Sequence, residues 1–177
     1  LRSNGETFPV ELTVVPVEVD EERLFTAFLR DITLVLRSER ELNRTTELLE
    51  AIADGTTDAV FVKDLKGRYL LFNQAASHLT GYSSEEVLGK DDMFLFGDDH
   101  GRGVMENDRL VMQSNQPRTV EEKLTASGIT RNYLAMKAPL RDSNGNVVGV
   151  IGISRDITEL KRIESTLRES EERYRSI

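Results

Sequence analysis

The chain has 177 residues and a mass of 20.0 kDa, which is enough for one ordinary domain with extensions. It contains no cysteine, so disulfide frameworks, thiolate metal sites, cysteine nucleophiles and covalent flavin–cysteine adducts are excluded. Its formal charge of −8 repels phosphates and anionic lipids, so nucleic acid and membrane surfaces are poor partners.

The longest uncharged apolar run, residues 147–153, is far shorter than the roughly 20 residues that a membrane helix needs. We therefore expect no membrane insertion by this segment. No secretory signal is visible, and the chain begins with Leu1 rather than Met. We expect it to be part of a longer protein, with any targeting information outside it.

An internal repeat divides the chain. Residues 9–16 match residues 132–139 in length and in their final proline, at an offset of 123. After a turn the offset becomes 125, and Arg-Asp-Ile-Thr at 30–33 recurs at 155–158. A hairpin turn tolerates such an insertion. The repeat therefore predicts two strand hairpins of the same kind, one near each end of the chain.

A charged segment follows each copy of Asp-Ile-Thr, and apolar residues recur in it at spacings of 3 and 4. The narrow stripe favours a dimeric coiled coil, and the alternative is an amphipathic helix packed on its own domain. Asp156 and Glu159 have the form of a capping box. The stripe residues are Val35, Ser38, Leu42, Thr45, Leu49 and Ile52, and then Leu160, Ile163, Leu167, Ser170, Tyr174 and Ile177.

Between these two segments, turn signals and periodicity predict two strands, several short helices and three longer strands. The expected elements are strands at 58–64 and 68–73, helices at 74–79, from 83 and at 104–113, an acidic loop at 91–103, and strands at about 118–126, 130–140 and 147–156.

These residues resemble a PAS domain. Residues 58–73, together with Gly-Tyr-Ser-Ser-Glu-Glu-Val-Leu-Gly at 81–89, are similar to its front half. Residues 139–145, together with a segment that ends in Asp-Ile-Thr at 156–158, are similar to its C-terminal half. The resemblance covers residues 56–158. Residues 1–33 resemble only the last two strands of a preceding PAS domain.

The resemblance implies an α+β fold with a five-stranded antiparallel sheet, short helices on one face and flanking amphipathic linker helices. We expect a C-terminal strand hairpin of a preceding PAS domain at 1–33, a linker helix at 34–55, a complete PAS domain at 56–158 and a signalling helix at 159–177. Because an isolated hairpin is marginally stable, residues 1–33 are expected to dock elsewhere.

The implied function is a sensory and signal-relay module of a larger cytoplasmic signalling protein, most often a sensor histidine kinase. The alternatives are a ligand-free dimerisation or spacer module, or part of a diguanylate cyclase or phosphodiesterase regulator. The expected partners are a second copy, bound through the linker helices and the outer sheet face, and neighbouring PAS and output domains. With two histidines, no cysteine and no Ser-His-acid grouping, the chain itself is not expected to be an enzyme.

No cofactor is predicted. Haem-binding members of the family usually place a histidine on the long helix before the third strand, and residues 104–117 contain none. His78 and His100 lie elsewhere, and covalent flavin chemistry lacks its cysteine.

The strand at 130–140 alternates between two sets of residues, and the internal repeat selects the inward one. At an offset of 123, Lys137 falls on Val14 of a plainly apolar face. A lone buried ammonium is costly, so an inward Lys137 needs a carboxylate partner, for which Glu122 is the best candidate, or an anionic ligand. Its outward neighbours would then form an apolar outer face made of Leu134, Met136, Ile151 and Ile153.

The pocket is therefore expected to be partly polar and to accept a small anionic or hydroxylated ligand, if it binds one. The candidate pocket residues are Leu71, Phe94, Leu110, Glu122, Tyr133, Lys137 and Val150.

Two weaker patterns remain. Asp91, Asp92, Asp98, Asp99 and His100 offer oxygen ligands, but their spacing matches no calcium loop, so a solvated acidic loop is expected and no metal site. Three further residues are expected first of all to cap helices, with a signalling role for the last two implied by resemblance: Asn73, Asp156 and Thr158.

Overall fold

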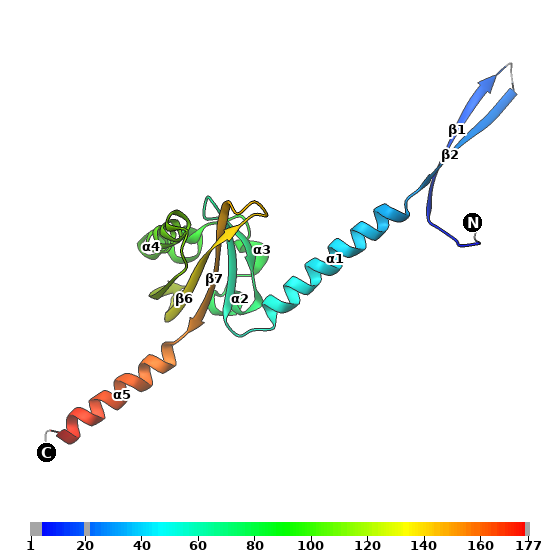
Figure 1. The fold of residues 1–177 in the computed structure, drawn as a ribbon. Coiled ribbons are helices and arrows are strands. Elements are labelled where there is room, and N and C mark those ends of the chain that lie inside the picture. The colour runs from blue at the N-terminus through cyan, green and yellow to red at the C-terminus, as the bar shows by residue number, and fades with distance from the viewer. Residues whose placement is uncertain (1–4, 20–21, 176–177) are drawn as a thin grey trace. The chain divides into compact units, whose positions relative to one another are not determined.

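The computed structural model describes residues 5–19 and 22–175, and Figure 1 traces their elements along the chain. The chain divides into two units, one up to Glu50 and one from Ala51 onward. The first unit holds a two-stranded sheet of β1 (Val10–Val19) and β2 (Glu22–Asp31), followed by most of helix α1 (Thr33–Asp54).

The hairpin β1–β2 has the same strand register as the hairpin formed by β6 (Ile129–Arg141) and β7 (Val147–Asp156). Val10 lies opposite Asp31, as Tyr133 lies opposite Asp156. These pairs differ by the offsets of 123 and 125 seen in the sequence. The predicted repeat is therefore confirmed at the level of strand pairing.

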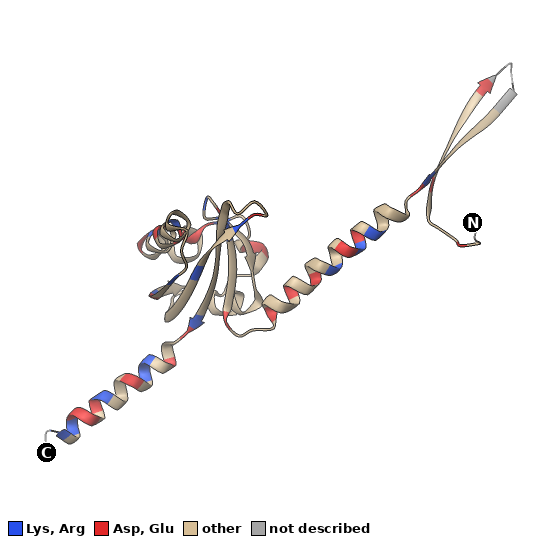
Figure 2. Cartoon of the chain, viewed as in Figure 1, with Lys and Arg blue, Asp and Glu red and all other residues tan. Residues whose placement is uncertain are grey.

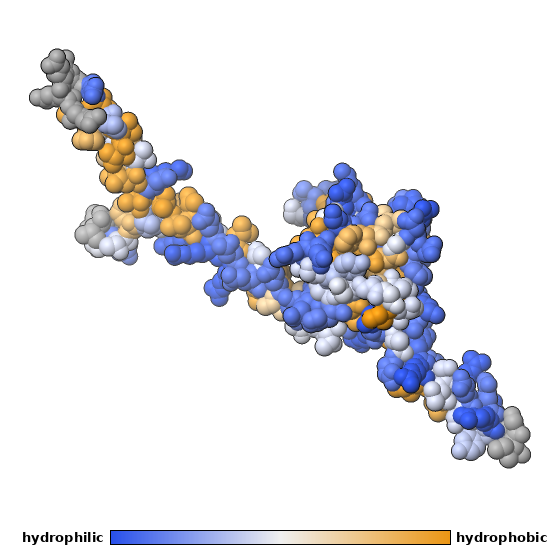
Figure 3. All heavy atoms as spheres, turned by 180° about the vertical axis from the view of Figure 1, so that it is seen from behind, coloured by the Kyte–Doolittle hydropathy of each residue, from blue (hydrophilic) through white to orange (hydrophobic). Residues whose placement is uncertain are grey.

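The hairpin β1–β2 exposes apolar side chains, and orange residues cover its strands in Figure 3. Their exposure agrees with a two-stranded sheet that has no further strand beside it among the described residues of its unit. The large exposed members include Leu12, Val14, Phe25, Phe28 and Leu29.

The second unit is built on a five-stranded sheet in the order β4-β3-β7-β6-β5, in which every pair is antiparallel. The predicted α+β fold with such a sheet is confirmed. The remaining strands are β3 (Ala59–Asp64), β4 (Tyr69–Phe72) and β5 (Arg118–Ala126).

Three helices cover the inner face of this sheet: α2 (Gln74–Thr80), α3 (Ser84–Val87) and α4 (Asp92–Ser114). Asn73 caps α2, as predicted, because its Oδ1 accepts the Ala76 N–H at 2.9 Å. Its Nδ2 also donates to the Ala53 carbonyl at 2.7 Å, which fixes the end of α1 against the domain.

Helix α4 begins much earlier than the sequence pattern predicts. Residues 91–103, expected to be a loop, form its first half, and Asp91 caps it by accepting the Met93 N–H at 3.1 Å. Gly97, with φ 66°, breaks the helix into two arms, and this break hides the helical period from a sequence reading. The acidic residues of the segment are therefore not all solvated, since Asp92 is fully buried.

The outer face of the sheet is apolar and exposed, as predicted. Met136 is 50% exposed, and Ile151 and Ile153 are each 37% exposed, while Leu134 is half-buried. Their inward neighbours on β6 are buried, so the alternation chosen from the repeat is confirmed.

Helix α5 (Thr158–Arg175) leaves the sheet at the end of β7. Its apolar stripe is exposed at Leu160, Ile163 and Leu167, and residues of both charge signs alternate along the helix in Figure 2. The last stripe residue, Ile177, lies outside the described residues. In the described part of the chain, each helix is too short or too polar to cross a lipid bilayer.

The two arms of α4 pack closely at Gly101, because this residue has no Cβ atom. A Cβ there would lie 2.8 Å from the Asp92 carbonyl oxygen and 2.9 Å from the Met93 Cα, which are backbone atoms that cannot easily move. We expect Gly101→Ala to lower the free energy of unfolding, measured in urea, by about 1–3 kcal/mol.

Gly103→Ala is the matched control, because a Cβ at Gly103 would meet no atom within 4 Å. Because alanine has a higher helix propensity than glycine, this substitution should raise the free energy of unfolding by up to about 1 kcal/mol. Equal effects of the two substitutions would contradict the close approach of the two arms.

Candidate functional site

Two lysines point into the helix-covered side of the sheet. Lys63 of β3 is 0% exposed and Lys137 of β6 is 2% exposed. Each lies on the inward side of its strand, between or beside buried apolar residues. The predicted inward orientation of Lys137 is confirmed. An ammonium group buried this deeply needs anionic partners, and the helices and β5 supply them.

Asp108 of α4 lies between the two ammonium groups. Its Oδ2 is 2.6 Å from Lys63 Nζ, and its Oδ1 is 2.9 Å from Lys137 Nζ. The Oδ1 contact is an ion pair whose geometry is too bent for a good hydrogen bond. One carboxylate therefore joins strands β3 and β6 through helix α4.

Each lysine has a second carboxylate. Lys63 Nζ lies 2.7 Å from both oxygens of Asp92, which also accepts the Tyr69 hydroxyl at 2.6 Å. Lys137 Nζ lies 2.9 Å from Glu122 Oε1, so the predicted pairing with Glu122 is confirmed. We call these five charged residues and Tyr69 the buried network.

The buried network contains two ammonium groups and three carboxylates, and each of these side chains is at least nine-tenths buried. It thus carries an excess of one negative charge. Burial raises the pKa of Asp92, and the Lys63 ammonium only partly offsets this. Burial lowers the pKa of Lys137, but Asp108 and Glu122 outweigh it, so the net shift is upward.

A cavity of about 40 Å³ adjoins the buried network. Lys63, Lys137 and Glu122 are the charged residues of its lining, and aromatic and aliphatic side chains make up most of the rest. Pockets for drug-sized ligands are usually about 300–1,000 Å³, so this cavity has room for only a few water molecules. Its aromatic lining consists of Phe61, Tyr69, Phe72, Phe96 and Tyr133.

Three of the candidate pocket residues line this cavity: Glu122, Tyr133 and Lys137. The structure places Leu71 on the other side of β4, because a register shift in the β3–β4 pair lets Tyr69 and Phe72 both point inward. Val150 is fully buried but does not line the cavity. The residue of β7 that lines it is Ser154.

The two other candidates, both on α4, also lie away from the cavity. Phe94 is 41% exposed and packs against Tyr82, with ring centroids 5.2 Å apart, since the break at Gly97 turns this arm. Leu110 is half-buried, and the inward face of the second arm is formed by Val104 and Asp108 instead.

The sequence reading missed Lys63, Asp92 and Asp108. Lys63 shares the inward side of its strand with Phe61, and this alternation was a usable signal. Asp92 was hidden because the first arm of α4 was read as a loop, whereas Asp108 lies in the predicted helix at 104–113 and no local pattern pairs it with a lysine of another strand. Among the described residues, no three His, Asp or Glu side chains are placed to hold a metal ion.

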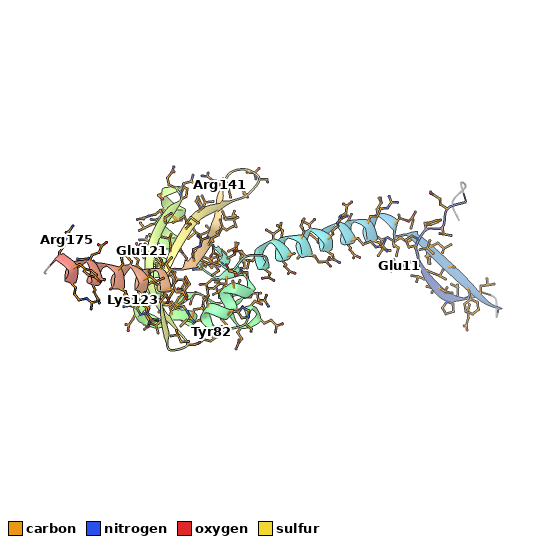
Figure 4. The ribbon with its side chains drawn as sticks, turned by 90° about the horizontal axis from the view of Figure 1, so that it is seen from below. Glu11, Tyr82, Glu121, Lys123, Arg141 and Arg175 are labelled. Atoms are coloured by element: carbon orange, nitrogen blue, oxygen red, sulfur yellow. The ribbon has the colours of Figure 1, made fainter. Side chains whose placement is uncertain are left out.

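The start of α5 is tied to β6. The Ile157 N–H donates to the Asn132 carbonyl at 2.8 Å, and the Asn132 N–H donates to Thr158 Oγ1 at 2.8 Å. Asp156 Oδ1 accepts the Thr158 N–H at 2.9 Å, which is the capping role predicted for it. On β5, Glu121 Oε2 lies 2.9 Å from Lys161 Nζ of α5, and Figure 4 labels Glu121 beside this helix.

The buried network predicts a loss of stability at high pH. Burial and the neighbouring Asp92 raise the pKa of Tyr69 well above 10.0. The unfolded chain loses the Tyr69 proton above this pH and the folded chain keeps it, so stability falls as the pH rises. The raised pKa of Lys137 acts in the same direction, because its contribution is complete below 10.5 and is lost as the pH rises through the folded value.

We therefore expect the free energy of unfolding, measured in urea, to fall steeply above pH 10. Tyr69→Phe should make this decline shallower by up to about 1.4 kcal/mol per pH unit, the value for one proton. Tyr174→Phe, on exposed α5, is the control and should leave the slope unchanged. The same alkaline slope in Tyr69→Phe and the wild type would refute the assignment.

The comparisons with known proteins agree with this geometry. The family model of the PAS fold matches residues 53–162, and a PAS domain model matches residues 1–34. The solved PAS domain of BvgS from Bordetella pertussis is 30% identical with a TM-score of 0.52, covering 74% of this chain and 98% of that one.

Two relatives are signalling proteins. The methanogenesis regulatory histidine kinase FilI of Methanothrix harundinacea is 32% identical over 123 residues, which are 69% of this chain and 14% of FilI. A diguanylate cyclase of Vibrio cholerae is 33% identical over 138 residues, which are 72% of this chain and 43% of the cyclase. The chain thus spans less than half of either relative. Since the PAS-fold model matches more than half of the chain, over the sheet, its helices and the buried network, the chain belongs to the PAS family.

Proposed function

We propose that this chain is a sensory and signal-relay module of a larger signalling protein. The preferred parent is a sensor histidine kinase. The observation that carries the proposal is the pair of hydrogen bonds between Asn132 of β6 and the start of α5. The same strand holds Lys137 of the buried network. A change at the network thus has a short, hydrogen-bonded route to α5.

The ion pair between Lys161 and Glu121 supports this route from a second strand. It is more exposed, with side chains 39% and 59% accessible, so it contributes less than the buried contacts. We propose that α5 passes the signal to an output domain in the parent protein. The chain itself supplies no catalysis in this proposal.

Thr158→Val tests the relay. It removes the acceptor of the Asn132 N–H while keeping the size and branching of the side chain. A neutral hydrogen bond contributes about 0.5–1.5 kcal/mol, so we expect the basal output of the full-length protein to shift by roughly two- to tenfold. For a kinase parent, the measurement is the rate of autophosphorylation.

Thr166→Val is the matched control, because Thr166 Oγ1 donates only to the Arg162 carbonyl one turn earlier in α5. It should leave the output within twofold of the wild type. Wild-type output from Thr158→Val, with its fold intact by circular dichroism, would rule out this route.

The input to the relay has two candidates. The first is a ligand of a few heavy atoms, and because both ammonium groups already have carboxylate partners, a neutral hydroxylated molecule fits better than an anion. The second candidate is a ligand-free module that relays changes from a neighbouring domain. The cavity volume of about 40 Å³ favours this second candidate.

Native mass spectrometry of the chain purified from cells separates these inputs. We expect the bare mass of 20.0 kDa per subunit, because the cavity has room only for water. The control is the same sample under denaturing conditions, which gives the mass of the protein alone. A reproducible excess of one small molecule per subunit would instead support ligand sensing.

We further propose that the chain forms a parallel homodimer in the cytoplasm through its linker helices and the outer face of the sheet. Leu160, Ile163 and Leu167 are 63%, 56% and 60% exposed and lie on one side of α5. Such a stripe on an otherwise charged helix favours pairing with a second copy over a free helix in water. Met136 and Ile153 are also exposed, on the outer face of the sheet.

The absence of cysteine makes a clean cross-linking test possible. Ile163→Cys should form a disulfide-linked dimer in most molecules under mild oxidation, since this position faces its counterpart in a parallel coiled coil. Ser165→Cys, on the opposite side of α5, is the control and should remain largely monomeric on a non-reducing gel. Equal cross-linking at both positions would contradict the proposed interface.

We propose, finally, the division into a hairpin of a preceding PAS domain at 1–33, a linker helix at 34–55, a complete PAS domain at 56–158 and a signalling helix at 159–177. The shared register of the two hairpins supports it. A diguanylate cyclase parent is the alternative to a kinase and is supported by the relative from Vibrio cholerae.

A further inference from the structure

We propose that Arg131 couples the wall of the cavity formed by α2 to the start of α5. Arg131 lies in the same row of β6 as the inward residues, two residues before Tyr133 and six before Lys137. Its guanidinium contacts the end of α2 and the carboxylate of Asp156, the last residue of β7, which accepts the first N–H of α5. The proposal deepens the relay function and rests on it for its consequence, but the coupling itself is measurable in this chain alone.

The first contact is at the end of α2. Arg131 Nη1 donates to the Leu79 carbonyl at 2.6 Å. The last carbonyls of a helix have no partner within it, so an outside donor stabilises this end. Ser127 Oγ donates to the next carbonyl, that of Thr80, at 2.8 Å. Leu79 and Thr80 both line the cavity, so this helix end moves with the cavity wall.

The second contact is at the start of α5. Arg131 Nε lies 3.4 Å from Asp156 Oδ2, and both side chains are largely shielded from water, with 22% and 30% exposed. The other oxygen of Asp156 accepts the Thr158 N–H. The carboxylate thus holds the first turn of α5 with one oxygen and the guanidinium with the other.

One planar guanidinium therefore stabilises the end of one helix and the carboxylate that begins another. Its fork has a fixed geometry, so a shift of the Leu79 carbonyl changes the position available beside Asp156. Coupling of this kind is reciprocal, because each helix end favours the side-chain position that the other requires. Lysine, with a single ammonium, cannot serve both ends in the same way.

Arg155 provides a matched control. It is the neighbour of Asp156 in sequence, and it forms an ion pair with Asp58 at 2.8 Å. Its side chain is 66% exposed, and among the described residues its guanidinium pairs with Asp58, which belongs to neither α2 nor α5. Loss of Arg155 thus removes an arginine–carboxylate pair of similar chemistry without removing the bridge.

Amide hydrogen exchange of the 177-residue chain, followed by NMR, tests the proposal at two reporter amides. Gly81 N–H donates to the Ser77 carbonyl at the end of α2, and Lys161 N–H donates to the Ile157 carbonyl at the start of α5. Arg131→Met should speed exchange at both amides by about tenfold, the effect of losing one charged hydrogen bond. Arg155→Met should change neither by more than twofold.

A double-mutant cycle separates coupling from simple destabilisation. Asp156→Asn should speed exchange at the distant Gly81 about threefold or more in the wild-type background and add nothing in the Arg131→Met background. Independent effects in the two backgrounds, or a change at only one reporter amide in Arg131→Met, would overturn the proposal.

Arg131→Lys keeps the test decisive if Arg131→Met does not fold. It retains a positive charge beside Asp156, so Lys161 should keep its protection while Gly81 loses it. Wild-type protection at both amides would show that no bridge is needed. Because these readouts need no output domain, coupled exchange with an unchanged output from Thr158→Val would reject the relay and keep the coupling.

Discussion

The second unit depends on the requirement that two buried ammonium groups be paired. Removing a charge from water costs several kcal/mol, and this cost is met only when carboxylates lie within contact distance. Lys63 and Lys137 come from two strands that β7 separates, and Asp108 of α4 contacts both. The pairing therefore fixes where α4 crosses the sheet, and with it the shape of the cavity between them.

This arrangement favours one packing over others more than it adds stability. An apolar core of the same volume is often as stable as a buried ion pair, but it tolerates sliding. Here a displacement of α4 by one helical turn would leave Asp92 and Asp108 without partners in a dry environment. Lys63, Lys137 and Glu122 of the buried network also line the cavity. Any rearrangement of the cavity would therefore require new ion-pair partners for all five charged side chains at once. Such a core suits a module with few discrete states better than one that adapts to many ligands.

The sequence alone was sufficient for the succession of strands along the second unit, the inward Lys137 and the capping role of Asn73, because periodicity and capping are local signals and the repeat selects the inward face of β6. It was not sufficient for the partners of the lysines. Asp92 lies 29 residues from Lys63, and Asp108 lies 45 away, so no local pattern joins them. The glycine break at Gly97 removed the helical period that would have placed Asp92 on an inward face, and the register shift beside Lys63 moved Leu71 out of the cavity wall.

The hairpin β1–β2 shows which parts of this design are separable. The Ile32 N–H donates to the Pro9 carbonyl, as Ile157 does to Asn132, so both hairpins lead into their helices in the same way. Yet Val14 stands at the position of Lys137, and Phe8 at that of Arg131. The junction between strand and helix thus occurs without a buried charge and without a guanidinium bridge. It follows that the hydrogen-bonded junction between strand and helix is common to both hairpins, whereas the buried network and the contacts of Arg131 belong to the second unit.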